Sequence, residues 1–334
     1  MNELIFFINK VVISGASIGS VYAMGAIGVT LIFAILRFAH FAHGDMMTMG
    51  AFFAYALTIL FPQAGQFVGL PTGFVMLPIA VVMTAFVAVY IDKGFYQPLR
   101  KNNVSSVVMV MASIGVTLML QGLIRLFGGI ESKHFFFDER KDIFRLSVPF
   151  ESASRKIVIT EPQILLFIFT LVAVFGVHFI LTKTKLGKAM RAVSDNPDLA
   201  QVSGININRV ITFTWIIAGG LAAAAGILLS LDVSLKPDLS FNLLLPIFAA
   251  AIVGGVGRPF GAVVGGFVVG FAETLSVFNW AVLLRPFRDN FPEWLEIPSR
   301  LSIVPTEYKI TVPFFILIVI LIWRPTGIFK GKVL

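Results

Sequence analysis

Long apolar segments, separated by short polar ones, make up most of the chain. Several of them approach or reach the roughly 20 residues that an α-helix needs to cross a bilayer. The sequence therefore predicts an all-α fold class, a polytopic helical membrane protein with about 8–9 membrane segments, including broken or re-entrant helices. The predicted spans are residues 11–36, 38–61, 74–91, 104–127, 162–182, 210–231, 262–284 and 309–323, with a shorter apolar segment at 241–256.

Two stretches interrupt the apolar pattern. The sequence GVGRPFG follows residues 241–256, and RFAHFAHGDMMTMG occupies residues 37–50 after the first span. A broken helix is tolerated at membrane depth only where protein buries it or where it lines a cavity. Both stretches place an arginine near an aromatic residue and a glycine, which is compatible with two related halves, an arrangement found in many membrane transport proteins.

The polar segments differ in net charge. Residues 92–103 carry a net charge of +2, and residues 183–209 and 324–334 carry +3 each, whereas residues 128–161, and residues 285–308 together with Lys309, are neutral. Positively charged loops face the cytoplasm. We therefore expect a cytoplasmic loop at 183–209, an extracytoplasmic insert at 128–161 and an extracytoplasmic loop at 285–308. Counting spans places the N-terminus outside and the C-terminus in the cytoplasm.

Composition supports one transmembrane domain over residues 1–334. The chain is 57% hydrophobic and only 13% charged, whereas soluble domains are about 25% charged. It contains no cysteine, which excludes disulfides and thiolate metal sites. The net charge of +8 is explained by basic cytoplasmic loops, so the expected partner is the lipid bilayer and no nucleic acid.

The polar segment 183–209 contains clear helix signals. Asn196 is a favoured N-cap residue, Pro197 fits the first helical position, and Gly204 stands where a C′ glycine belongs. Between them residues 198–203 can form about two helical turns, with Asp198 in the first turn, where a negative charge suits the helix dipole. The segment is either a docking element or an ordinary loop with a capped turn.

Ionisable residues within the apolar regions are costly and point to function. Arg37, His40, His43 and Asp45 cluster in one stretch, and Glu273 stands alone among small residues. His40 and His43 would share a face of a helix, but a metal site needs further ligands, so no metal is expected. These residues either contact substrate or satisfy broken backbone and neighbouring helices.

Motifs for energy supply and for catalysis are missing. The chain has no G-x-x-x-x-G-K-[ST] phosphate loop, no H-E-x-x-H sequence and no nucleophile elbow. It also lacks the series of intramembrane carboxylates found in proton-coupled carriers. We therefore expect no enzyme activity in this chain, and a transport protein of this kind needs a partner that supplies energy.

Three segments of the chain form recognisable motifs, namely GASIGSVYAMGAIGVTLIFAILRFAHFAHGDMMTMGAF, TKLGKAMRAVSDNPDLAQVSGIN and AAIVGGVGRPFGAVVGG. Together with the terminal RPTGIFK, they resemble the branched-chain amino acid permease family of bacterial ABC importers, to which urea and short-amide permeases are related. The resemblance covers nearly the whole chain. His40 stands where the family more often has asparagine.

The resemblance implies an inner-membrane permease subunit that moves solute by alternating access. Its expected partners are two cytoplasmic ATPases, which bind the ATP and Mg that this chain does not, a second related permease, and a periplasmic or extracellular solute-binding protein. Residues 189–205 would enter the ATPase cleft. The residues expected to couple to the ATPase are Lys188, Arg191, Asn196, Pro197, Asp198 and Gly204.

Three other functions remain as alternatives. A stand-alone secondary carrier or channel would work without ATPases, and related importers carry urea, short amides or other amino acids. An intramembrane metal enzyme using His40, His43 and Asp45 would require bound metal.

Overall fold

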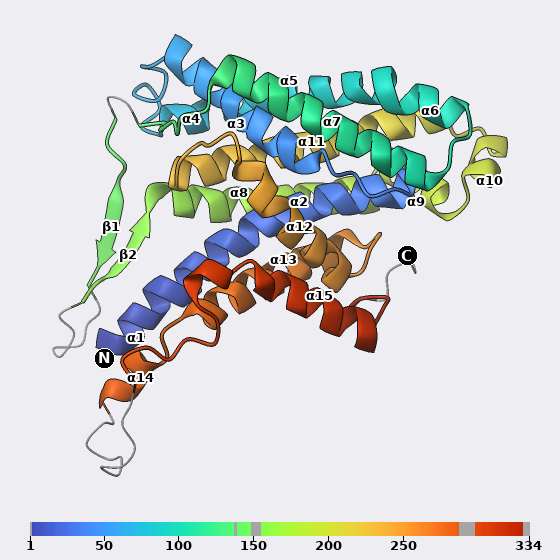
Figure 1. The fold of residues 1–334 in the computed structure, drawn as a ribbon. Coiled ribbons are helices and arrows are strands. Elements are labelled where there is room, and N and C mark those ends of the chain that lie inside the picture. The colour runs from blue at the N-terminus through green and yellow to red at the C-terminus, as the bar shows by residue number, and fades with distance from the viewer. Residues whose placement is uncertain (1, 137–138, 148–154, 287–297, 330–334) are drawn as a thin grey trace.

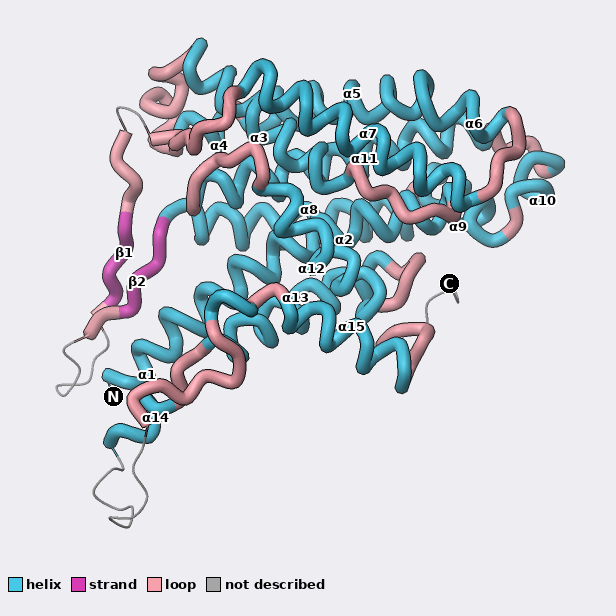
Figure 2. Tube along the Cα trace, viewed as in Figure 1, coloured by secondary structure: helices cyan, strands magenta, loops and turns pink. Residues whose placement is uncertain are grey.

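The computed structural model describes residues 2–136, 139–147, 155–286 and 298–329. Its helices run side by side between the two ends of an elongated bundle (Figure 1). Figure 2 shows helix over most of the described chain, with one two-stranded ribbon at one end. The predicted helical membrane fold is confirmed.

Six helical runs in the described chain are long and apolar enough to cross a membrane. With the helix α3 (His43–Leu60) and the shorter apolar helices α12 (Leu239–Gly254) and α15 (Thr311–Trp323), they give nine segments in the described residues, within the predicted range. The six runs are α1–η1–α2 (Asn2–Phe7, Ile8–Ile13, Ser14–Leu36), α5–η2–α6 (Leu77–Ile91, Asp92–Tyr96, Gln97–Lys101), α7 (Ser106–Gly128), α8 (Glu161–Lys183), α11 (Ile207–Asp232) and α13 (Pro259–Val277).

Shorter elements connect these helices. The strands β1 (Ile143–Leu146) and β2 (Ile157–Thr160) pair antiparallel within the predicted insert. The remaining short elements are α4 (Thr72–Val75), α9 (Lys185–Asp195), α10 (Pro197–Val202), α14 (Ala281–Leu284) and the 3₁₀ turn η4 (Thr306–Tyr308).

Several predicted boundaries were wrong, including the end of the span predicted at residues 262–284, which the structure places at Val277. The first span starts at Asn2 rather than at residue 11, because a π-helical stretch continues it past Lys10, whose side chain is exposed. The second span starts at His43 rather than at residue 38, because α2 ends at Arg37 in a left-handed conformation (φ 59°). The predicted loop after Ile91 is helical as far as Lys101, and an ion pair of 2.6 Å between Asp92 and Arg100 joins η2 to α6.

The helix α2 forms the centre of the bundle. It packs against α13, α11, α12 and α8, and most of its residues are buried. Glycine permits close contacts of α2 and of its neighbours. A Cβ atom at Gly266 of α13 would lie 2.5 Å from the backbone nitrogen of Ala23 in α2, and, between α11 and α3, one at Gly226 would collide with the carbonyl of Met47. Close backbone approach at small residues is the usual way in which membrane helices associate.

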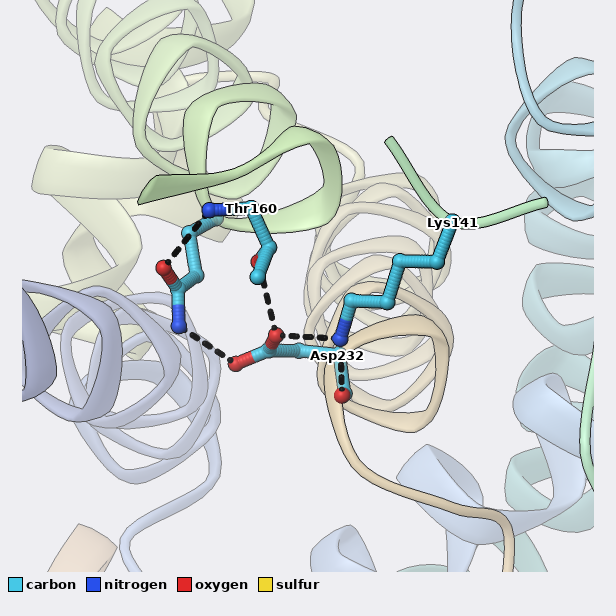
Figure 3. Close-up of polar contacts among 4 residues, drawn as sticks. Lys141, Thr160 and Asp232 are labelled. Atoms are coloured by element: carbon cyan, nitrogen blue, oxygen red, sulfur yellow. Dashed lines mark hydrogen bonds and ion pairs between the residues drawn. The ribbon is translucent and has the colours of Figure 1, made fainter. Parts of the chain in front are cut away.

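An acidic residue at the end of α11 ties the insert to the bundle (Figure 3). The carboxylate of Asp232 accepts hydrogen bonds from Lys141 (2.9 Å), Thr160 (3.0 Å) and Gln163 (3.2 Å). These residues come from the chain before β1, the end of β2 and the first turn of α8. One side chain therefore joins both sides of the hairpin to two membrane helices.

Polar segments of like charge gather at the same end of the bundle. The segments α6, α9 and α10 lie together at the end called here the α10 end (Figure 1). The chain after α15 is bonded to the end of α12 by a hydrogen bond of 2.9 Å from Ile328 N to Val253 O, and its Phe329 lines the same hollow as Arg191 of α9. The opposite end, called the hairpin end, holds β1, β2, α1 and α14. There the Asn9 side chain bonds the backbone of Lys156 (3.0 Å) and Val158 (3.1 Å).

We expect Gly266→Ala to lower the free energy of unfolding by about 1–3 kcal/mol, because the new methyl group would force α13 away from the backbone of α2. Thermal unfolding in detergent measures this change. Gly122→Ala is the matched control: Gly122 is exposed on α7, and nothing lies within 4 Å of the place that its new Cβ atom would take. Equal effects of the two substitutions would contradict close packing at the α2–α13 crossing.

Candidate functional site

The helix predicted after Asn196 is present. The Asn196 side chain accepts a hydrogen bond of 3.0 Å from the backbone nitrogen of Leu199, Pro197 begins α10, and Gly204 follows the helix with φ 84°. A second helix, α9, lies directly before it and was not predicted. Thr184 caps α9 by accepting a hydrogen bond of 3.1 Å from Gly187 N, and this N-cap threonine was the signal that could have revealed it.

The helix α9 is fixed to the bundle on two sides. Its residues Met190 and Val193 are buried. Arg191 donates to the carbonyl of Leu181 at the end of α8 (2.7 Å), and Arg37, which ends α2, donates to the carbonyl of Ser194. The segment predicted to contact the ATPase, residues 183–209, is therefore attached through α9 directly to the ends of α2 and α8.

The helix α10, by contrast, presents most of its surface outward. Leu199 is 64% exposed and Val202 86% exposed, and these two apolar side chains are one turn apart. Neither was among the predicted coupling residues, which are exposed as well: Lys188, Arg191, Asn196, Pro197, Asp198 and Gly204. A hollow of about 700 Å³ separates α10 from α6.

The polar stretch between α2 and α3 is deeply buried apart from Arg37. His40 lies in the non-helical connection, His43 begins α3, and both are fully buried. Their spacing predicts that the two imidazoles share a helix face, but they do not, because only His43 is helical. Their ring centroids are 6.3 Å apart. Asp45 is buried in the first turn of α3, where its charge suits the helix dipole.

Two aromatic residues that sequence reasoning missed complete this buried region. Tyr96 of η2 and Trp215 of α11 are fully buried beside His40, with ring centroids 5.5 Å and 4.8 Å from its imidazole. They come from helices more than fifty residues away along the chain, so no local pattern could have linked them to His40.

Glu273 belongs to a different site. Its carboxylate accepts a hydrogen bond of 2.7 Å from the Tyr22 hydroxyl of α2 and forms an ion pair of 2.7 Å with Lys309, just before α15. The tyrosine lies 15 residues before Arg37 on the same helix, a distance of about 22 Å. Glu273 therefore lies apart from the histidine stretch. The residue joins α13, α2 and the start of α15.

Among the described residues, no group of three or more His, Cys, Asp or Glu side chains is placed to hold a metal ion.

Comparison with known proteins identifies the family. The family model "Branched-chain amino acid transport system / permease component" matches residues 11–321. The chain belongs to this family. The match takes in α10, the buried stretch after α2 and Glu273, so every candidate site lies within the shared permease region.

Relatives of this permease match it along almost their whole length. It is 29% identical to the high-affinity branched-chain amino acid transport system permease protein BraD of Pseudomonas aeruginosa, over 98% of this chain and 97% of the relative. It is 28% identical to LivH of Escherichia coli K12 over the same shares. It is 31% identical to a probable LivH of Methanocaldococcus jannaschii over 89% of both chains. No solved structure matches the chain.

The contact between Glu273 and Lys309 can be tested by a double-mutant cycle. We expect Glu273→Gln and Lys309→Met each to lower the free energy of unfolding by about 1–2 kcal/mol, less than for a fully buried pair because Lys309 is 39% exposed. The double variant should be less destabilised than the two effects added. Thermal unfolding in detergent measures all four forms, and strict additivity would contradict the pairing.

Proposed function

We propose that this chain is the transmembrane permease subunit of an ABC importer for branched-chain amino acids. The family match over residues 11–321 carries this proposal, together with relatives that are named branched-chain amino acid permeases. Solute crosses by alternating access, in which the helices expose a pathway first to one side of the membrane and then to the other. The free energy comes from ATP hydrolysed in partner subunits, since this chain has no phosphate loop.

The α10 end faces the cytoplasm in this proposal. The three segments of positive net charge, at 92–103, 183–209 and 324–334, support it, because positive loops stay on the cytoplasmic side. The hairpin end, with the neutral segments, then faces outward, with the N-terminus outside and the C-terminus inside. A binding protein would deliver the solute there.

The helix α10 is the proposed contact with the ATPase. It is short, capped at both ends and exposed, and it carries two apolar side chains, Leu199 and Val202, that its own chain does not cover. Large exposed apolar side chains mark interaction surfaces when they are grouped. Because α9 is bonded to the ends of α2 and α8, displacement of α10 would be transmitted to these membrane helices.

The complete importer would contain two ATPases, this permease, a second related permease and a solute-binding protein. Purification of the tagged chain from detergent, with identification of the accompanying proteins, tests this composition. Recovery of an ATPase in a fixed ratio supports the importer. Recovery of the chain alone, together with solute movement in liposomes free of other proteins, would favour a stand-alone carrier. Titration of the recovered binding protein with leucine, glutamate and urea separates the possible solutes.

We expect Leu199→Asp and Val202→Asp to weaken ATPase binding by about 30-fold, because a charge would replace an apolar contact at the centre of a small interface. Leucine import should fall in parallel, while thermal stability of the isolated chain stays unchanged, since both side chains are exposed. Val233→Asp, at a 66% exposed position of the hairpin end, is the control. Normal ATPase affinity in both α10 variants would exclude this helix as the contact.

A further inference from the structure

The buried aromatic cluster around His40 has an unusual composition. It consists of Phe38 and His40 from the connection after α2, Tyr96 from η2 and Trp215 from α11, all at most 2% exposed. The Tyr96 and Trp215 rings stack with centroids 5.4 Å apart, and His40 stands edge-on to both. Three separate segments of the chain therefore close against one another at this point.

The polar atoms of the cluster have no partners among the described residues. Both ring nitrogens of His40, the Tyr96 hydroxyl and the Trp215 indole nitrogen are buried without a hydrogen bond. Leaving such groups unpaired is costly, and buried polar atoms in proteins are nearly always bonded. Either trapped water satisfies them in this conformation, or they meet their partner in another conformation of the protein.

The chemistry of the cluster suits an α-amino acid. The indole N–H, the phenol and a protonated imidazole nitrogen are donors that a carboxylate accepts. The faces of Trp215 and Tyr96 are surfaces over which an ammonium group binds. An apolar side chain would lie against Phe38. These groups together could receive both charges and the side chain of a small zwitterion.

The cluster is also connected to the coupling segment. Arg37, directly before Phe38, has a strained left-handed backbone (φ 59°) and donates to the carbonyl of Ser194 in α9. Tyr96 ends a π-helical segment, a feature frequent at functional sites, and the following α6 lines the hollow beside α10. Movement of α9 would thus be transmitted to the cluster through Arg37, and movement of α10 through α6 and Tyr96.

We propose that Phe38, His40, Tyr96 and Trp215 form a gate in the transport pathway. These side chains move apart when a displacement of α9 is transmitted to Arg37, and they then bind the charged groups of the passing amino acid. This inference rests on the proposed import function. In the conformation described here the gate is closed, and its polar atoms become bonded only when it opens to substrate.

Two substitutions remove the polar atoms and keep the rings, namely His40→Phe and Tyr96→Phe. In the complete importer reconstituted in liposomes, leucine import should fall about tenfold or more, because hydrogen bonds to a charged group are lost. The melting temperature should stay unchanged or rise by about 2 °C, because the closed gate no longer contains unpaired polar atoms. Tyr90→Phe, at a 67% exposed tyrosine of α5, is the matched control and should leave both quantities unchanged.

Three other results would contradict the proposal, and each would identify a different reason. A melting temperature lowered by more than about 2 °C would show that the polar atoms are already bonded in the closed state, by trapped water. Import within twofold of wild type would show that they do not contact substrate. Failure of the wild-type importer itself to take up leucine would overturn the proposed function, and the gate with it.

The proposed connection between α9 and the gate through Arg37 can be tested separately, by the fluorescence of Trp215. A variant that keeps Trp215 and replaces Trp280, Trp294 and Trp323 by Phe reports the surroundings of the gate alone. ATP binding by the partner subunits should shift its fluorescence to longer wavelength as the indole becomes exposed. Arg37→Ala should abolish this shift, whereas Arg209→Ala, at an exposed arginine early in α11, should preserve it. No shift in the parent variant, or an unchanged shift after Arg37→Ala, would overturn the gate or its connection.

Discussion

The close approach of α2 to its neighbours is the constraint on which the rest of this structure depends. Inside a bilayer, apolar side chains gain little by leaving lipid, so helices associate through tight packing and a few polar contacts. Here α2 meets α13 where Gly266 faces the backbone of Ala23. The same helix carries Tyr22, which bonds Glu273, and ends at Arg37. Its position therefore sets the geometry of both polar sites.

The two ends of the bundle are held together by different means. At the hairpin end, Asp232 joins the insert to α8 and α11 through several hydrogen bonds, which favours a rigid surface there. At the α10 end, arginine side chains reach backbone carbonyls of neighbouring helices. One hollow lies there between α6 and α10, and another lies between α9, α2 and the start of α13. Long side chains and open space allow relative movement. This asymmetry agrees with the proposed contacts, a solute-binding protein at the hairpin end and an ATPase at the α10 end.

The connection after α2 combines features that a stable core would avoid. It contains a strained residue, two fully buried imidazoles and a break in the helix within a membrane protein. Such features persist where the surrounding structure compensates for them, and they occur often at sites of movement or binding. They lie between α9 and the central helices of the bundle.

The sequence alone determined the membrane fold, the approximate spans, the capped helix after Asn196 and the family resemblance, because each rests on local apolar length, local capping chemistry or contiguous motifs. It missed α9, the early start of the first helix and the helical continuation to Lys101, since helix ends depend on neighbouring contacts such as the pair Asp92–Arg100. Only the tertiary structure brought Tyr96 and Trp215 to His40 and separated Glu273 from that stretch. Those contacts join residues far apart in the chain, and which helices meet is decided by packing along the whole bundle.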